Sequence, residues 1–299
     1  MFAANLLWIP FTLLAAAGQT ARNAMQRELT TALGTVGATH VRFLFGFPFA
    51  IAILAGVLIA TRLPLPTPPP IFWPWVVLGA GAQIVATATM LATMNSRSFV
   101  VTIAYIKTEA IQAALFGLIF LGDSVTTGMV VAILVATAGV VAMSLKGKGA
   151  MEGGIGPVAL GLFSGAMFAI SAVGYRGAIL SLGLPSFVLA ATFTVTVGLL
   201  MQAGLLTLYL ALRDRAVLLA IVKAWRPSVF AGLMGATASE FWFLAFALTS
   251  VANVRTLALV EVLFAQAITI VAFKQATTRR DALGVALIVI GVLLLIWVQ

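Results

Sequence analysis

Two ionisable residues stand near the middle of an almost unbroken apolar stretch, SFVVTIAYIKTEAIQAALFGLIFL (98–121): Lys107 and Glu109. The ionisable residues of the later apolar stretches include Glu240, Arg255 and Glu261. A charge at the centre of a membrane-spanning helix costs about 2.5–3.5 kcal/mol on insertion scales. Such residues usually face a bundle interior or a wet cavity, and often mark the path of an ion or a substrate. Two interpretations follow: an internal ion-pair network, or a site that binds a substrate or a proton.

Helical geometry restricts how these charges pair. Lys107 and Glu109 are two residues apart, roughly 200° around a helix, so we expect them not to face each other. Lys107 would then need a carboxylate on another helix, either Glu240 or Glu261. Three acids against two bases in this group leave at least one carboxylate without a basic partner.

Other candidate residues are polar or aromatic side chains within the apolar stretches. Several recur at spacings of three and four, which place them on one helical face. Such a stripe serves either hydrogen bonding between helices or the lining of a shared cavity. Together with the charged residues, the substrate-binding or coupling candidates are Gln19, Gln83, Thr87, Tyr105, Gln112, Tyr175 and Trp242.

The composition indicates the elements that must position these residues. Hydrophobic residues make up 62% of the 299 residues and charged residues only 8%, whereas a soluble domain is about half apolar and a quarter charged. Apolar stretches of about 20 residues, long enough to cross a bilayer as helices, recur along the chain. The sequence therefore predicts an all-α integral membrane protein with ten transmembrane helices, at roughly 4–22, 38–60, 71–94, 98–121, 126–145, 156–180, 185–212, 227–249, 252–273 and 281–298.

Other site chemistries lack residues in this sequence. There is no Cys, and a lone His40 cannot build a metal site or a catalytic relay by itself. No Walker-type glycine loop is present, so we expect no ATP site, no cofactor and no enzymatic activity. The net charge of +9 lies mainly in short loops beside the predicted spans, which favours the membrane surface over nucleic acid as the reason for it.

Weak internal similarity divides the chain into two halves. Pro74 and Gly79 recur 153 residues later in RPSVFAGLMG, and Glu109 recurs 152 residues later as Glu261. Residues 1–148 and 149–299 would then each hold five helices. Because five is odd, the second half enters the membrane from the opposite side, which makes an inverted repeat. In transporters with this architecture the substrate site lies near the midplane between the repeats.

Three segments resemble the drug/metabolite transporter superfamily, in its ten-helix branch with two EamA-type repeats. They are HVRFLFGFPFA (40–50), TEAIQAALFGLIFLGDSVT (108–126) and VEVLFAQAITIVAFKQATT (260–278), the last two followed by GVVAMSL and GVLLLIW. Arg42 and Phe43 match the family's Arg-Phe pair, and Glu109 and Glu261 match its helix glutamates. The chain departs from the pattern at the prolines that should follow these glutamates, which are Ala110 and Val262, and at the second Leu-Gly-Glu triplet, which is Phe273-Lys274-Gln275.

The resemblance implies a gradient-driven exporter of small metabolites, with amino acids as the best-known substrates. Acids and bases at one cavity also suit a zwitterion. An exporter of drugs or organic cations is an alternative, because a lone carboxylate among aromatic rings attracts a cation. The sequence favours a sugar-phosphate exchanger less, since its site would need several converging basic residues and only Lys107 and Arg255 are candidates. A lipid scramblase is the fourth hypothesis for the function.

The basic residues predict how the protein is oriented. Arg62 lies on one side of the predicted bundle, and the other side carries Arg22, Arg27, Arg42, Arg97, Lys146, Lys148, Arg213, Arg215, Lys223, Arg226, Lys274, Arg279 and Arg280. The positive-inside rule places the second group in the cytoplasm and both termini outside, whereas the resemblance implies termini inside. We expect a multi-pass protein of a bacterial inner membrane, a monomer or a homodimer, with protons as a candidate coupling ion.

Overall fold

The computed structural model describes residues 6–96, 99–144, 155–264, 266–267 and 278–298, and every regular element in these ranges is a helix. The linker between the two expected repeats, the end of the ninth predicted span and the triplet 273–275 lie outside the described residues. The helices are α1 Trp8–Leu44, α2 Phe47–Thr61, α3 Phe72–Ser96, α4 Phe99–Ile106, α5 Glu109–Leu121, α6 Thr127–Ser144, α7 Ile155–Ser181, α8 Phe187–Arg213, α9 Arg215–Lys223, α10 Trp225–Leu248, α11 Val251–Leu257 and α13 Arg279–Trp297.

By length and composition, the structure is that of a helical membrane protein. Within the described residues, five stretches are long and apolar enough to cross a bilayer: Trp8–Thr61, Phe72–Met94, Ile155–Ser181, Phe187–Arg213 and Trp225–Leu248. Shorter apolar helices cover Glu109–Leu121, Thr127–Met143 and Ala282–Trp297.

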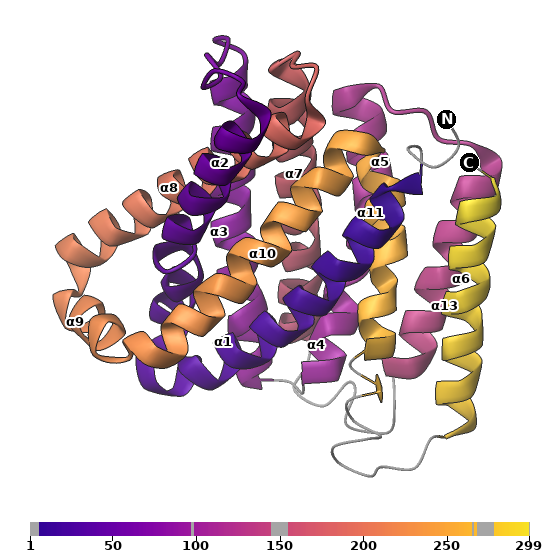
Figure 1. The fold of residues 1–299 in the computed structure, drawn as a ribbon. Coiled ribbons are helices and arrows are strands. Elements are labelled where there is room, and N and C mark those ends of the chain that lie inside the picture. Colours follow the sequence, from indigo (N-terminus) through magenta and orange to yellow (C-terminus); the bar gives the residue numbers. More distant parts are fainter. Residues whose placement is uncertain (1–5, 97–98, 145–154, 265, 268–277, 299) are drawn as a thin grey trace.

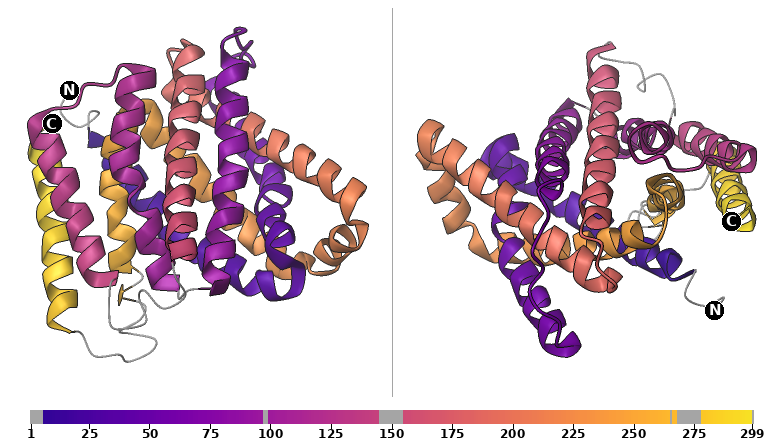
Figure 2. Two further views of the ribbon diagram at one scale, coloured as in Figure 1. Left: turned by 180° about the vertical axis from the view of Figure 1, so that it is seen from behind. Right: turned by 90° about the horizontal axis from the view of Figure 1, so that it is seen from above.

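The helices run back and forth between two ends of the bundle (Figures 1 and 2). We call one end the terminal end, because α1 begins there and α13 finishes there. The other is the α9 end, which also carries the turn of α1 at Gly34. Gly34 has a φ of 66° and a ψ of 175°, a conformation that glycine adopts without a Cβ penalty.

The first predicted span is too short. The sequence placed its end at residue 22, but the helix continues to Gly34, beyond the most apolar residues. The second predicted span, 38–60, is divided between the end of α1 and α2. The break at Phe45 and Gly46 has a local cause, because Pro48 lacks the N–H that would bond the Leu44 carbonyl.

Three helix pairs run together over much of their length: α3 with α7, α1 with α10, and α6 with α13. Glycines allow the closest approaches. A Cβ on Gly174 of α7 would lie 2.7 Å from the backbone nitrogen of Gly79 on α3. Small residues at helix contacts let backbones pack closely where no hydrophobic effect drives association. Each of the three pairs joins a helix before residue 148 to one after it.

Candidate functional site

Two helices break at the glutamates that the sequence placed at equivalent positions. α4 ends at Ile106 and α5 begins at Glu109, with Lys107 and Thr108 in the turn between them. The Thr108 hydroxyl donates to the Tyr105 carbonyl at 2.8 Å, and the Ile111 N–H bonds the Thr108 carbonyl three residues back. In the other helix, α11 leads into a 3₁₀ turn, Ala258–Val260, directly before Glu261. Both glutamates therefore follow a tightened turn rather than lying within a regular helix.

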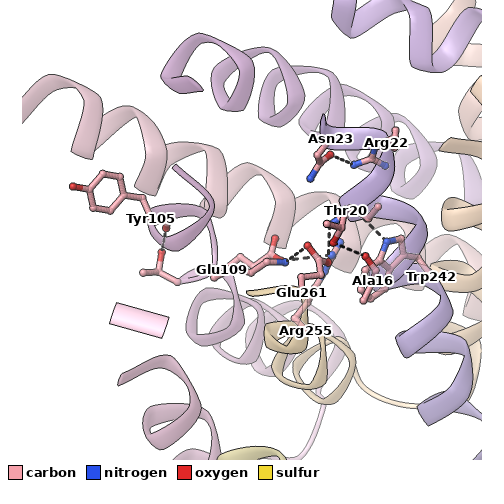
Figure 3. A network of polar contacts seen from close by, with 12 residues as sticks. Ala16, Thr20, Arg22, Asn23, Tyr105, Glu109, Trp242, Arg255 and Glu261 are labelled. Atoms are coloured by element: carbon pink, nitrogen blue, oxygen red, sulfur yellow. Dashed lines mark hydrogen bonds and ion pairs between the residues drawn. The ribbon is translucent and has the colours of Figure 1, made fainter. Parts of the chain in front are cut away.

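Four charged side chains meet between these breaks, and we call them the ion-pair cluster: Lys107, Glu109, Arg255 and Glu261. The Lys107 Nζ lies 2.9 Å from Glu261 Oε2 and 3.5 Å from Glu109 Oε1. The Arg255 Nη1 lies 3.6 Å from the same Glu109 oxygen. All four side chains are buried, with at most 4% of each residue exposed. Figure 3 shows Glu109, Arg255 and Glu261 converging.

One part of the predicted pairing is confirmed and another is wrong. Lys107 is held by Glu261 on another helix, as its position in an apolar span required. It also contacts Glu109, which the angular argument excluded. That argument assumed a continuous helix, whereas the chain turns at Lys107 and Thr108. The same break removes Tyr105 from the face of Glu109, and Figure 3 shows the Tyr105 ring pointing away from the cluster.

An amide and two aromatic rings border the cluster. Gln19 on α1 donates to Glu261 Oε1 at 2.9 Å and accepts from the indole N–H of Trp242 at 3.0 Å. The Arg255 guanidinium lies 4.8 Å from the centre of the Trp242 ring and 5.3 Å from that of Phe246. A cation over an aromatic face within about 6 Å is attracted by the ring quadrupole. Gln19 and Trp242, both predicted, thus belong to the same network as the charges.

Two further arginines lie inside the protein, and we call them the arginine pair: Arg22 and Arg42. Their exposed fractions are 0% and 1%. Arg22 Nη2 donates to Asn23 Oδ1 at 2.7 Å, and Arg42 donates to Thr87 Oγ1 and Ser239 Oγ, each at 3.4 Å. The Arg42 guanidinium also lies 5.2 Å from the centre of the Phe43 ring. No carboxylate of the described residues lies within ion-pair distance of either guanidinium.

The arginine pair corrects two predictions. Arg22 was assigned to a loop because the span was ended too early, and Arg42 was counted with the basic residues at a membrane surface. Both are instead buried where α1 meets α10, and a Cβ on Gly235 would lie 3.4 Å from Arg22 Cδ and 3.3 Å from Arg42 Cγ. A pattern in the sequence could have revealed Arg22. The spacing Thr12, Ala15, Gln19 continues on the same face to Asn23 and Gln26, with Arg22 beside them.

Glu240 lies apart from the ion-pair cluster. Its Oε1 accepts a hydrogen bond from Thr192 at 2.5 Å, and its Oε2 is buried without a hydrogen-bond partner. No basic side chain of the described residues pairs with it. Of the two partners considered for Lys107, Glu240 is therefore the wrong one. It is also the acid that the predicted excess of carboxylates over bases left without a mate.

The remaining predicted residues belong to the packing around the site. Gln202, which the sequence analysis missed, donates to Gln83 Oε1 at 2.9 Å, and the Tyr175 hydroxyl donates to the same oxygen at 3.4 Å. Thr87 joins this α3 face to Arg42. Gln112 is half-buried, and its Oε1 has no hydrogen-bond partner.

Comparison with known proteins identifies the fold and nothing finer. No family model matches the chain, and no curated protein matches it. Among solved structures, 26 chains match. One of them, described only as a crystal structure of a protein, superposes with a TM-score of 0.70 at 19% sequence identity, over 99% of this chain and 96% of its own. The whole helical arrangement thus recurs in an experimentally determined structure.

Proposed function

We propose that the protein is a secondary active transporter that moves a small polar or zwitterionic metabolite across a membrane by alternating access. The observation that carries this proposal is the ion-pair cluster at the breaks of two helices, one from each half of the chain. Discontinuous helices with charged groups at their breaks are typical of substrate and coupling-ion sites near the bilayer midplane. An amino acid is the leading substrate and export the proposed direction.

The helix contacts support an inverted repeat with ten spans. If 1–148 and 149–299 are related halves, α1 corresponds to α7 and α3 to α10. Exchanging the halves then turns the α3–α7 pair into the α10–α1 pair, and both pairs are present. The α6–α13 and α2–α8 contacts are each converted into themselves. This is the contact pattern that a two-fold axis between the halves would produce.

The experiment is counterflow in proteoliposomes. Purified protein is reconstituted with a high internal concentration of mixed amino acids, and uptake of each labelled amino acid from outside is followed. A carrier gives transient uptake above that of empty liposomes, and the Glu261→Gln variant loses it. If no amino acid exchanges but a fluorescent lipid equilibrates between leaflets, the protein is a scramblase and the proposal is wrong.

An organic-cation exporter is the second candidate, and Glu240 favours it. The carboxylate of Glu240 is 8% exposed and has one oxygen without a partner. A permanently charged cation in the same counterflow assay distinguishes the two functions. Exchange of the cation that depends on Glu240, without exchange of any amino acid, would favour this candidate.

A further inference from the structure

The buried charges of the described residues do not balance. In the ion-pair cluster two bases meet two acids, so the cluster is neutral when all four are ionised. The arginine pair adds two positive charges, and arginine does not lose its proton in proteins. Glu240 is engaged with Thr192 and pairs with neither arginine. The interior thus holds two guanidinium groups that have no carboxylate of the described residues within ion-pair distance.

An uncompensated buried charge is unfavourable. Removing an ion from water costs several kcal/mol unless an opposite charge and hydrogen bonds replace the water. Here Arg22 Nε and Nη1, together with Arg42 Nε, are buried and have no hydrogen-bond partner among the described residues. The bonds that do form go to one amide oxygen and two hydroxyls, the latter at 3.4 Å. Several donors therefore remain available to a group that the described residues do not supply.

The chemistry of that group follows from the donors. A guanidinium presents its N–H groups in a planar fork that matches the two oxygens of a carboxylate or a phosphate. The aliphatic parts of both arginine side chains pack against Gly235, where the lack of a side chain leaves room for them. The Ser239 hydroxyl of α10 lies beside Arg42 and can donate to a third oxygen, whereas the Thr87 hydroxyl of α3 already donates to the Gln83 carbonyl at 2.8 Å.

The location links the pair to the proposed transport path. Arg22 is on α1 one turn beyond Gln19, which contacts the ion-pair cluster (Figure 3). Arg42 follows the turn at Gly34 and reaches α3 and α10. Arg42 therefore connects helices from the two halves, and Arg22 packs against Gly235 of α10, so a ligand bound here would contact both halves.

We propose that Arg22 and Arg42 form an oxyanion site that binds the carboxylate or phosphate group of a small solute. Its place in transport rests on the proposed function, but binding does not. Four interior bases, rather than the two that the sequence offered, favour an anion or a zwitterion over an organic cation as the substrate. The protein supplies the charge for the anionic group, and the ligand supplies the missing counter-ion.

The test is a binding measurement on the full-length protein in nanodiscs of phosphatidylcholine. The melting temperature is recorded with increasing sodium phosphate or sodium acetate, against sodium chloride at equal ionic strength, in the wild type and in Arg22→Gln, Arg42→Gln and Arg27→Gln. Arg27 is an exposed arginine on the same helix and serves as the matched control. A ligand that binds only the folded state raises its melting temperature.

We expect phosphate or acetate to stabilise the wild type and Arg27→Gln, with an apparent Kd at least about tenfold tighter than in Arg22→Gln or Arg42→Gln. Without ligand, the two buried variants should melt no lower than the wild type, because they remove an unpaired charge. If a glutamine variant fails to fold, Arg→Lys at the same position replaces it; it keeps the charge, loses the fork and should bind more weakly. Equal responses of all variants, or no response of the wild type, would overturn the proposal.

Two further arms separate the alternatives. Nanodiscs that contain phosphatidylglycerol test a lipid headgroup: arginine-dependent stabilisation by that lipid, without any response to phosphate or acetate, would overturn the assignment to a solute. The counterflow assay is scored separately. Arginine-dependent anion binding without counterflow keeps the site and contradicts transport. Counterflow that Arg22→Gln and Arg42→Gln retain keeps transport and shows that the site is not on the transport path.

Discussion

Lys107 illustrates how a charge is tolerated in an apolar interior. Its ammonium group lies between the carboxylates of Glu261 and Glu109, and Arg255 also contacts the carboxylate of Glu109. The four charges alternate in sign, so each has at least one opposite neighbour at 2.9–3.6 Å. Burial of this kind gives little net stability, but loss of one member leaves a charge that the interior cannot solvate.

Replacing Lys107 by Met should therefore destabilise the protein strongly. The substitution leaves Glu261 with only the Gln19 amide, and we expect a loss of about 3–5 kcal/mol in the free energy of unfolding. Reversible unfolding in mixed micelles measures this. The control is Glu240→Gln, which removes a buried carboxylate that has no basic partner. A loss in Lys107→Met no larger than that in the control would contradict the account of the cluster.

The glutamates of the cluster should matter more for transport than for folding. In Glu109→Gln and Glu261→Gln an amide oxygen can still accept a hydrogen bond, and Lys107 keeps the other carboxylate. We expect both variants to fold, with melting temperatures below the wild type because each leaves one base of the cluster uncompensated, and to lose counterflow. If either glutamate served only as an ion-pair partner, its variant would transport normally once folded.

Some site residues could be predicted from the sequence and others could not. The cost of an isolated buried charge was enough to predict that Lys107 would bind a carboxylate on another helix. The contact between Lys107 and Glu109 could not be foreseen, because it depends on a break that neither Pro nor Gly marks. Arg22 was missed for a different reason. A prediction from hydropathy ends a helix where the apolar residues end. In the structure α1 continues through a polar stretch that other helices bury.

At the scale of the elements, the break between α4 and α5 is built from a short turn. Ala110 lies in the first turn of α5, where its N–H reaches the Lys107 carbonyl only at 3.4 Å. Proline is tolerated in the first turn of a helix, because the N–H it lacks has little to bond there. The resembled family places a proline at this position, and the broken helix gives a reason for it.

Ala110→Pro should therefore keep the fold, and Ala113→Pro should not. Both alanines are fully buried in α5, but the N–H of Ala113 lies within the helix. There proline removes a hydrogen bond, clashes with the preceding turn and costs about 3 kcal/mol or more. Melting temperatures of the two variants in the same detergent compare them directly. Equal losses would mean that α4 and α5 behave as one continuous helix.

The breaks were the hardest elements to predict. The apolar stretches 98–121 and 252–273 read as single helices, since periodicity reports which residues are apolar and not where the backbone turns. The turn at Gly34 and the break before Pro48 are different, because a glycine and a proline mark them in the sequence. The sequence could not predict that α3 packs against α7 and α1 against α10, because apolar helices have many similar faces.

For the whole molecule, the exposed basic residues predict the orientation in the membrane. On the described residues, exposed bases gather towards the α9 end: Arg27, Arg213, Arg215, Lys223, Arg226, Arg279 and Arg280. The terminal end carries Arg62, which is exposed beyond α2. Removing the buried Arg22 and Arg42 from the sequence-based count reduces the bias without reversing it. The positive-inside rule still places the α9 end in the cytoplasm.

A C-terminal fusion should report a terminal end outside the cytoplasm. A reporter that is active only in the cytoplasm should be inactive when fused after residue 299. The same reporter fused after Asp214, at the α9 end, should be active. The reverse pair of results would show that the family's usual orientation holds and that the charge bias does not set the topology of this chain.

Alternating access requires the buried charged region to open in turn to each side of the membrane. The chain contains no Cys, so a single introduced thiol is a unique reporter. Ser239 lies beside Arg42 and is 3% exposed, and Ser239→Cys changes little in size. We predict that a charged, membrane-impermeant thiol reagent modifies this cysteine when added to either side of sealed vesicles. Arg62→Cys and Arg215→Cys should each react from one side only. Modification of Ser239→Cys from neither side, in folded protein with reactive controls, would show a static core and contradict the account.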